Sequence, residues 1–513
     1  MTVSPQFCIP YFMSLFRNAS LPEFFMKSIP VILRSVVIVL LLSAPSICLR
    51  SDADDSSREM AAKLAEISRK HDLPAMVAAV VNSEGLVTSA CSGNRKRGTA
   101  DEVELSDRFP IGSNTKSMTA TLAAVLVESG KINWNTTVGN VWPKASDKDI
   151  HPKLAAVTLD ELLSHQSGLP ANISDVSAQA WASFFDEKQS PALERRRMLK
   201  LVLSNPPSHA RGKFVYSNLG YAVASAMLET SAGESFESLM RKHVFGPLEM
   251  QSADFRSMES AKQLQPPLLW GHQADGGKPL DPRNAGSENP TVYAAAGTIH
   301  VSIEDYAKYA AWQLAGKPAP VLRSKDVFDH LHKPQADYTT AGAKYGSGWI
   351  MMNTGLGPAF NHAGSNTNTF ALIWLFPESD FGVIVCTNSG QEQAFAACDE
   401  MVSHLMAQHA GSNNLQPQPA LVAPALGEIG PERLVGRYQL APNFVFDVTL
   451  RDGHVMVGIT NQPTQEVFAD SPTRWSYRGV DAKLEFHLRA KGPAYALTLH
   501  QNGAAQKAKR IRD

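Results

Sequence analysis

The sequence has no surplus of charge of either sign and few cysteines. Its 513 residues contain 48 Lys plus Arg against 49 Asp plus Glu, so no basic excess would attract nucleic acid. Two of the five cysteines, Cys8 and Cys48, lie in or beside the N-terminal segment, which leaves Cys91, Cys386 and Cys398. Three cysteines do not form a disulfide framework, and none has the neighbours expected of a catalytic thiol. We expect Cys386, inside an apolar run, to be a small buried hydrophobe.

Familiar catalytic and metal-binding motifs are missing as well. The sequence has no G-x-S-x-G nucleophile elbow, which counts against the α/β-hydrolase fold. It also has no H-E-x-x-H motif and no paired-cysteine motif, so zinc chemistry has no ligands to point to. We therefore expect no metal and no cofactor.

The first fifty residues differ in kind from the rest. Lys27 and Arg34 precede the short apolar run 36–42, and small residues follow it up to Ser46. This order is typical of an export signal, and the run is too short for a confident membrane span. We expect a periplasmic or secreted protein cleaved near Ser46, with an uncleaved membrane tether as the alternative. Residues 1–25 are an upstream extension if translation starts at Met26.

A serine and a lysine three residues apart are the strongest chemical feature. Ser113-Asn-Thr-Lys116 stands at the start of a helix predicted from about residue 113 to 128. Residues at i and i+3 share a helix face, so Lys116 can approach the Ser113 oxygen, and the free N–H groups of the first turn favour developing negative charge. The pattern S-x-x-K arises by chance about once in a chain of this length, so it does not establish catalysis alone.

Two further segments follow in order. Tyr216-Ser-Asn218 precedes a predicted helix, and His362-Ala-Gly364 stands at the start of the apolar run 369–376, which predicts a buried strand with its edge at the cleft. Taken singly, Tyr216 would be a half-buried core aromatic and His362 a structural histidine.

Together the three segments resemble the penicillin-recognising serine hydrolases, which include class C β-lactamases, D-alanyl-D-alanine carboxypeptidases, D-aminopeptidases and related esterases. The stretches 162–169 and 295–298 also look like landmarks of that family, and the resemblance covers roughly residues 57–408. It implies an α/β (α+β) β-lactamase-like fold: an antiparallel sheet flanked by helices, an all-helical subdomain, and an active site between them.

The resemblance implies an acyl-enzyme formed on Ser113 and later hydrolysed by water. Either Lys116 or Tyr216 can take the serine proton, because burial favours a neutral amine, whereas a neighbouring ammonium favours a phenolate. The resemblance favours Tyr216 as the base and later the acid, but the sequence leaves the choice open.

Binding roles are implied for the remaining motif residues. Asn218 would orient the substrate or the lysine through its amide. Gly364 would let the substrate backbone come close, and the backbone N–H groups of Ser365 and Ser113 would form the oxyanion hole. His165, in the stretch 162–169, is expected to pin a loop rather than reach the serine.

The third segment departs from the family pattern. Many members carry lysine where this chain has His362 and threonine where it has Ala363, and both help to hold a substrate carboxylate. A histidine with an ordinary pKa is mostly neutral at neutral pH, and alanine donates no hydrogen bond. The departure favours a peptidase, including one for D-residue peptides, or an esterase. A β-lactamase or D-Ala-D-Ala carboxypeptidase is the alternative, and a catalytically silent cell-wall-fragment binder is the alternative of another class.

The predicted organisation has four parts: an N-terminal extension with a signal or anchor (1–50), the hydrolase domain (51–409), a Pro-rich linker (410–428) and a small antiparallel barrel (429–513). The barrel resembles the lipocalin-like domain often appended to this family. The expected partner is a small peptide, ester or β-lactam-like substrate, and the sequence does not determine the oligomeric state.

Overall fold

The computed structural model describes most of the chain beyond the N-terminal segment. The described residues are 47–48, 55–412 and 430–511, except 147, 187–188, 257–261, 266, 276, 285, 339–342, 392, 442–443, 452, 460–463, 470, 478–481, 490–491 and 502–503. Nearly all of the predicted export signal and most of the predicted linker fall outside them. No described helix combines the length and apolar character needed to cross a membrane.

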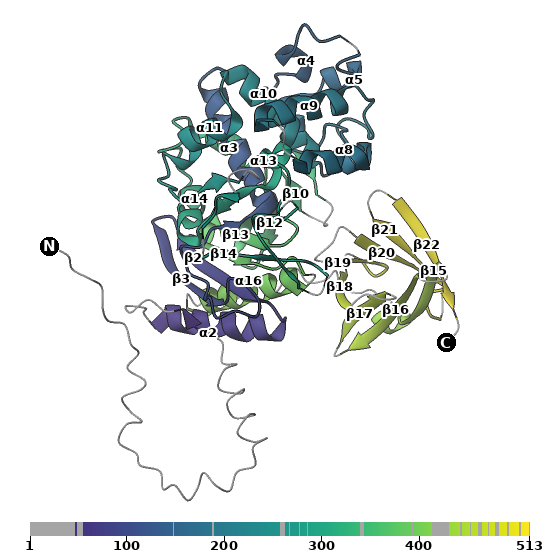
Figure 1. Ribbon diagram of the computed structural model, residues 1–513. Helices are drawn as coiled ribbons and strands as arrows, with labels where there is room; N and C mark the ends of the chain where they lie inside the picture. The colour runs from purple at the N-terminus through teal and green to yellow at the C-terminus, as the bar shows by residue number, and fades with distance from the viewer. Residues whose placement is uncertain are drawn as a thin grey trace, which may run out of the picture. The chain divides into compact units, whose positions relative to one another are not determined.

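A nine-stranded antiparallel sheet organises residues 47–412 (Figure 1). Its strands, in order across the sheet, are β1 (Ile47–Cys48), β3 (Gly85–Gly93), β2 (Ala75–Asn82), β14 (Phe381–Thr387), β13 (Phe370–Phe376), β12 (Gly357–Ser365), β11 (Ile350–Thr354), β10 (Lys344–Tyr345) and β9 (Ala336–Asp337). The N-terminal hairpin of β2 and β3 joins the C-terminal strands through the β2–β14 pairing. The sheet is therefore built from both ends of this region, and it is antiparallel and flanked by helices, as the family resemblance implied.

Helices cover both faces of the sheet because its central strands are apolar on both sides. Alternate residues of β2 enter different cores: Val77 packs with Tyr306 of α14 (Ile303–Ala315), whereas Met76 packs with Leu64 of α2 (Asp55–Lys70). Helix α16 (Gln393–Ser412) lies on the α2 side and continues into the first residues of the predicted linker. Cys386, in β14, is 2% exposed, which confirms its predicted burial.

The middle of the chain is largely helical. Its helices are α3 (Thr115–Glu128), α4 (Val138–Val141), α5 (Pro152–Ala155), α6 (Leu159–Leu163), α7 (Ile173–Val176), α8 (Ala178–Ser183), α9 (Pro191–Leu203), α10 (Asn218–Ala232), α11 (Phe236–Met240), α13 (Ala294–Gly297) and α15 (Lys325–Leu331). Small sheets are formed by β4 (Phe109–Pro110), β8 (Ile299–Val301) and β5 (Asp254–Phe255), and by β6 (Gly271–His272) and β7 (Pro279–Leu280).

The apolar run 369–376 forms a buried strand, β13 (Phe370–Phe376), as predicted, but the placement of His362 at its start was wrong. The sequence analysis placed His362 at the start of the apolar run 369–376, but His362 lies in a separate strand, β12. There it is paired with Ile373 of β13. Residues 366–369 connect the two strands. The polar residues of β12 concealed it, because they serve the site and break the apolar alternation of a strand.

Eight strands form a closed antiparallel barrel in the C-terminal region, which confirms the predicted architecture. They are β15 (Gly436–Ala441), β16 (Phe444–Arg451), β17 (His454–Ile459), β18 (Gln465–Ala469), β19 (Arg474–Tyr477), β20 (Ala482–His487), β21 (Ala496–Gln501) and β22 (Ala504–Ile511). Pairing of β15 with β22 closes the barrel. Alternate side chains such as Phe446 and Val448 fill its own core, as expected for a small barrel.

Candidate active site

Ser113 lies in a tight turn that leads into α3. The turn, η3 (Gly112–Asn114), is a 3₁₀ helix, so the α-helix itself begins two residues later than predicted. Residues three apart eclipse one another in 3₁₀ geometry. The Lys116 Nζ consequently lies 2.9 Å from the Ser113 Oγ, which brings the two predicted residues together.

Lys116 is fully buried and has two other acceptors. Its Nζ lies 2.7 Å from the Asn218 Oδ1 and 2.7 Å from the Ala296 carbonyl oxygen. Burial lowers the pKa of this amine well below its ordinary value. A neutral amine has two N–H groups and one lone pair. If the two N–H groups serve Asn218 and Ala296, the lone pair faces the Ser113 hydroxyl.

Asn218 is held so that its oxygen faces the lysine. Its Nδ2 donates to the Asn172 Oδ1 at 2.8 Å, which leaves Oδ1 for Lys116. Helix α10 begins at Asn218 because the Ser217 side chain caps it, accepting from the Gly220 N–H. The sequence Tyr-Ser-Asn therefore combines a helix cap with the residue that orients the amine.

Tyr216 contributes a neutral phenol. Its hydroxyl hydrogen-bonds with Ser113, and its ring centroid lies 4.9 Å from the Lys116 Nζ. Burial raises the pKa of Tyr216 above its ordinary value, and the Ser113 hydrogen bond offsets only part of this effect. Burial thus favours the uncharged form of both groups, which suits a base at the lysine and a proton donor at the tyrosine.

A chain of hydrogen bonds connects His165 to His362 through Tyr345. The His165 Nδ1 accepts from the Ser217 N–H at 3.0 Å, so its Nε2 carries the proton and donates to the Tyr345 hydroxyl at 3.1 Å. That hydroxyl lies 3.2 Å from the His362 Nε2, while the His362 Nδ1 lies 2.6 Å from the Ala363 carbonyl oxygen. These partners assign the tautomers: Tyr345 donates to His362, whose Nδ1–H points to the backbone.

His362 is neutral over the physiological pH range. Burial, with a smaller effect from the Lys116 charge, lowers its pKa to about 3. Its Nε2 already accepts a hydrogen bond and its Nδ1–H is used, so the side chain offers a substrate neither a cation nor a free donor.

Two glycines let β12 touch the serine turn. A Cβ on Gly364 would lie 2.0 Å from the Ile111 carbonyl oxygen and 2.8 Å from the Ser113 nitrogen. A Cβ on Gly112, where φ is +51°, would lie 2.4 Å from the Ser365 nitrogen. Side chains would force the segments apart, so the contact requires glycine. The backbones of Ser113 and Ser365, predicted to form the oxyanion hole, therefore meet at this junction.

Three contributors escaped the sequence analysis. Tyr345 and Asn172 are single polar residues that form no recognisable spacing with the motifs. The Ala296 carbonyl belongs to a stretch that resembled a family landmark, but a backbone acceptor has no side-chain signal. His165 was expected to pin a loop, and its hydrogen bonds join its loop to the residue after Tyr216.

A beta-lactamase family model matches residues 60–405. Unguisins hydrolase ungD of Aspergillus violaceofuscus is 29% identical over 247 residues, which cover 46% of this chain and 41% of that protein. Penicillin-binding protein 4 of Amycolatopsis lactamdurans is 24% identical over 377 residues, which cover 70% of this chain and 93% of that protein. The chain thus spans less than half of the first relative and nearly all of the second.

A solved structure with the same fold is the octameric penicillin-binding protein homologue from Pyrococcus abyssi. It superposes with a TM-score of 0.57 at 20% identity, covering 89% of this chain and 100% of that one. This likeness extends the shared fold over most of the described chain. The family match covers more than half of the sequence and contains the serine, tyrosine and histidine segments. This chain therefore belongs to the beta-lactamase family.

Proposed function

We propose that this protein is a serine hydrolase that cleaves an amide or ester bond through an acyl-enzyme on Ser113. The observation that carries the proposal is the 2.9 Å contact between the Ser113 Oγ and the Nζ of a fully buried Lys116. A desolvated amine at this distance can remove the serine proton, which an exposed ammonium cannot.

Each group then has one task. Lys116 takes the proton as the Ser113 oxygen bonds to the carbonyl carbon, and the backbone N–H groups of Ser113 and Ser365 stabilise the oxyanion. The bond to the leaving group breaks as Tyr216 donates its proton, which Lys116 restores. Water then hydrolyses the ester by the same steps in reverse. This assignment differs from the role that the family resemblance suggested for Tyr216, because burial raises its pKa.

The substrate class follows from His362. A neutral imidazole with both nitrogens engaged cannot balance a carboxylate beside the scissile bond, so we propose a peptidase or esterase for neutral substrates. The relative named unguisins hydrolase is consistent with such a hydrolase.

A matched pair of substrates tests this function. Acyl-dipeptides ending in D-alanine are offered as the free acid and as the methyl amide, together with L-residue versions, p-nitrophenyl butyrate and nitrocefin. We expect a fluorophosphonate to label Ser113 and the amide to be cleaved at least about tenfold faster than the acid, the cost of one unpaired charge contact. A preference for the acid would refute the neutral-substrate class, and no labelling of folded protein would favour the silent binding protein.

Replacing Tyr345 by phenylalanine is expected to introduce an acidic limb into the pH–rate profile. The Tyr345 hydroxyl donates to the His362 Nε2, a hydrogen bond that only the neutral imidazole can accept, so its loss should raise the His362 pKa above about 3, although burial still lowers it. The kcat/KM of the wild-type protein should not change with His362 protonation between pH 5 and 8, whereas that of the variant should start to fall at the acidic end of this range.

A buried tyrosine of α14 provides the control for this variant. Tyr309→Phe removes a hydroxyl that contacts Thr121, so it should cost stability without adding a limb. Equal profiles for wild-type protein and Tyr345→Phe would contradict the role of Tyr345.

Export is a separate proposal. The predicted signal would be removed near Ser46, and strand β1, which pairs with β3, begins at the next residue. Fractionation of cells that express the full chain, with N-terminal sequencing, would test this boundary.

A further inference from the structure

A cavity lies among the helices of residues 138–203. Its volume is about 530 Å³, within the range of roughly 300–1,000 Å³ that small-molecule sites occupy. One wall is a face of α9, where Arg196, Leu199, Lys200 and Leu203 follow the i, i+3, i+4, i+7 spacing of a helix stripe. The opposite wall is the segment after α4.

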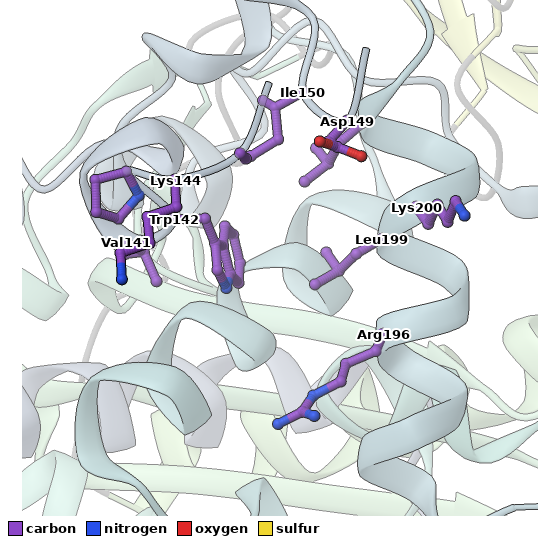
Figure 2. A pocket seen from close by; sticks show the side chains of 11 residues that line it. Val141, Trp142, Lys144, Asp149, Ile150, Arg196, Leu199 and Lys200 are labelled. Atoms are coloured by element: carbon purple, nitrogen blue, oxygen red, sulfur yellow. The ribbon is translucent and has the colours of Figure 1, made fainter. Parts of the chain in front are cut away.

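The interior of this cavity is apolar. Its floor is formed by Val141, Trp142, Ile150, Leu199 and Leu203. Figure 2 shows the Trp142 and Leu199 side chains facing each other across it. Both are only partly buried, although they pack against the main core. The stripe from Arg196 to Leu203 extends about 10 Å along α9, so the floor is elongated.

The rim of the cavity is positively charged. Lys144, Arg196 and Lys200 line it, and none of their side chains forms a salt bridge or hydrogen bond with another described residue, although the Lys200 charge helps to lower the pKa of Asp149. The one acidic group, Asp149, already accepts hydrogen bonds from the Ser146 nitrogen at 3.0 Å and the Ser146 hydroxyl at 2.7 Å. An elongated apolar floor beside Arg196, which has no ion-pair partner among the described residues, matches a chain with one anionic end.

We propose that this cavity binds the free carboxylate of a medium- or long-chain fatty acid, with the alkyl chain along α9 and the carboxylate at Arg196. The site is separate from Ser113 and does not depend on the hydrolase function. Binding there buries alkyl surface against Leu199 and Trp142, while Arg196 supplies charge-assisted hydrogen bonds.

Calorimetric titration of the full chain with dodecanoate below its micellar concentration tests the proposal. We expect one saturable site. Arg196→Glu should weaken binding by about tenfold to a hundredfold, since a charge-assisted hydrogen bond contributes about 1.5–3 kcal/mol. Leu199→Asp, which places a charge on the floor, should abolish it.

Control variants and ligands distinguish binding in the cavity from non-specific binding of an anionic amphiphile to the protein surface. Lys148→Glu reverses an exposed cation of the same segment that does not line the cavity, and it should bind dodecanoate as the wild type does. Circular dichroism verifies that each variant is folded. The proposal would be overturned if dodecyltrimethylammonium bound equally well, or if folded Arg196→Glu and Leu199→Asp bound dodecanoate as the wild type does. It would also be overturned if no saturable binding occurred, or if the protein bound only to anionic phospholipid vesicles.

Discussion

Ser113→Ala is expected to lower kcat for the best ester or amide substrate by about 10⁴-fold or more, since removal of a catalytic nucleophile has effects of this size in serine hydrolases. Alanine removes the Ser113 Oγ, which lies 2.9 Å from the Lys116 Nζ. No acyl-enzyme can then form, so intact mass spectrometry should show no fluorophosphonate adduct.

A serine at the other end of the same helix serves as the matched control. The Ser129 hydroxyl donates to the Leu126 carbonyl at the C-terminus of α3, far along the helix from the nucleophile. Ser129→Ala should keep labelling and turnover close to wild type. If Ser113→Ala retained substantial turnover, the acyl-enzyme proposal would be wrong.

Lys116→Met is expected to reduce kcat/KM by about 10²- to 10⁴-fold, the usual contribution of a general base. Methionine preserves most of the buried volume but cannot accept the serine proton. The exposed Lys131, just after α3, provides the control, since Lys131→Met should leave turnover unchanged.

Stability gives an independent measurement of the same residue. The folded chain holds the Lys116 pKa well below its unfolded value, so the unfolded state binds more protons and stability rises with pH. Over the interval between the two pKa values, this single group contributes up to about 1.4 kcal/mol per pH unit. Urea unfolding at several pH values between 7 and 9.5 gives the free energy of unfolding as a function of pH. This free energy should rise less steeply with pH for Lys116→Met than for wild type or Lys131→Met. An equal rise would mean that Lys116 is charged in the folded protein.

Local patterns in the sequence carried much of the fold. The helix that follows Ser113, the helix that follows Tyr216, the strand at 369–376 and the closed barrel follow from apolar periodicity and turn residues, which report short-range geometry. The same kind of reasoning misplaced His362, because β12 carries polar side chains at the site and therefore lacks a regular apolar alternation.

The site divides in the same way. Ser113 and Lys116 could be paired from sequence because helical geometry links residues three apart. The resemblance to a known family brought Tyr216, Asn218 and His362 into the same hypothesis.

Tyr345, Asn172 and the Ala296 carbonyl could not be predicted, since they meet the motifs only across distances of 17 to 180 residues in the chain.

The sequence by itself determined the class of the fold, the pairing of Ser113 with Lys116 and the order of the motifs. Only the tertiary structure decided the charge states: burial leaves Lys116 and His362 with lowered pKa values and raises that of Tyr216. The physical reason is that a pKa depends on solvent exclusion and on hydrogen-bond partners, which are supplied by segments far apart in the chain.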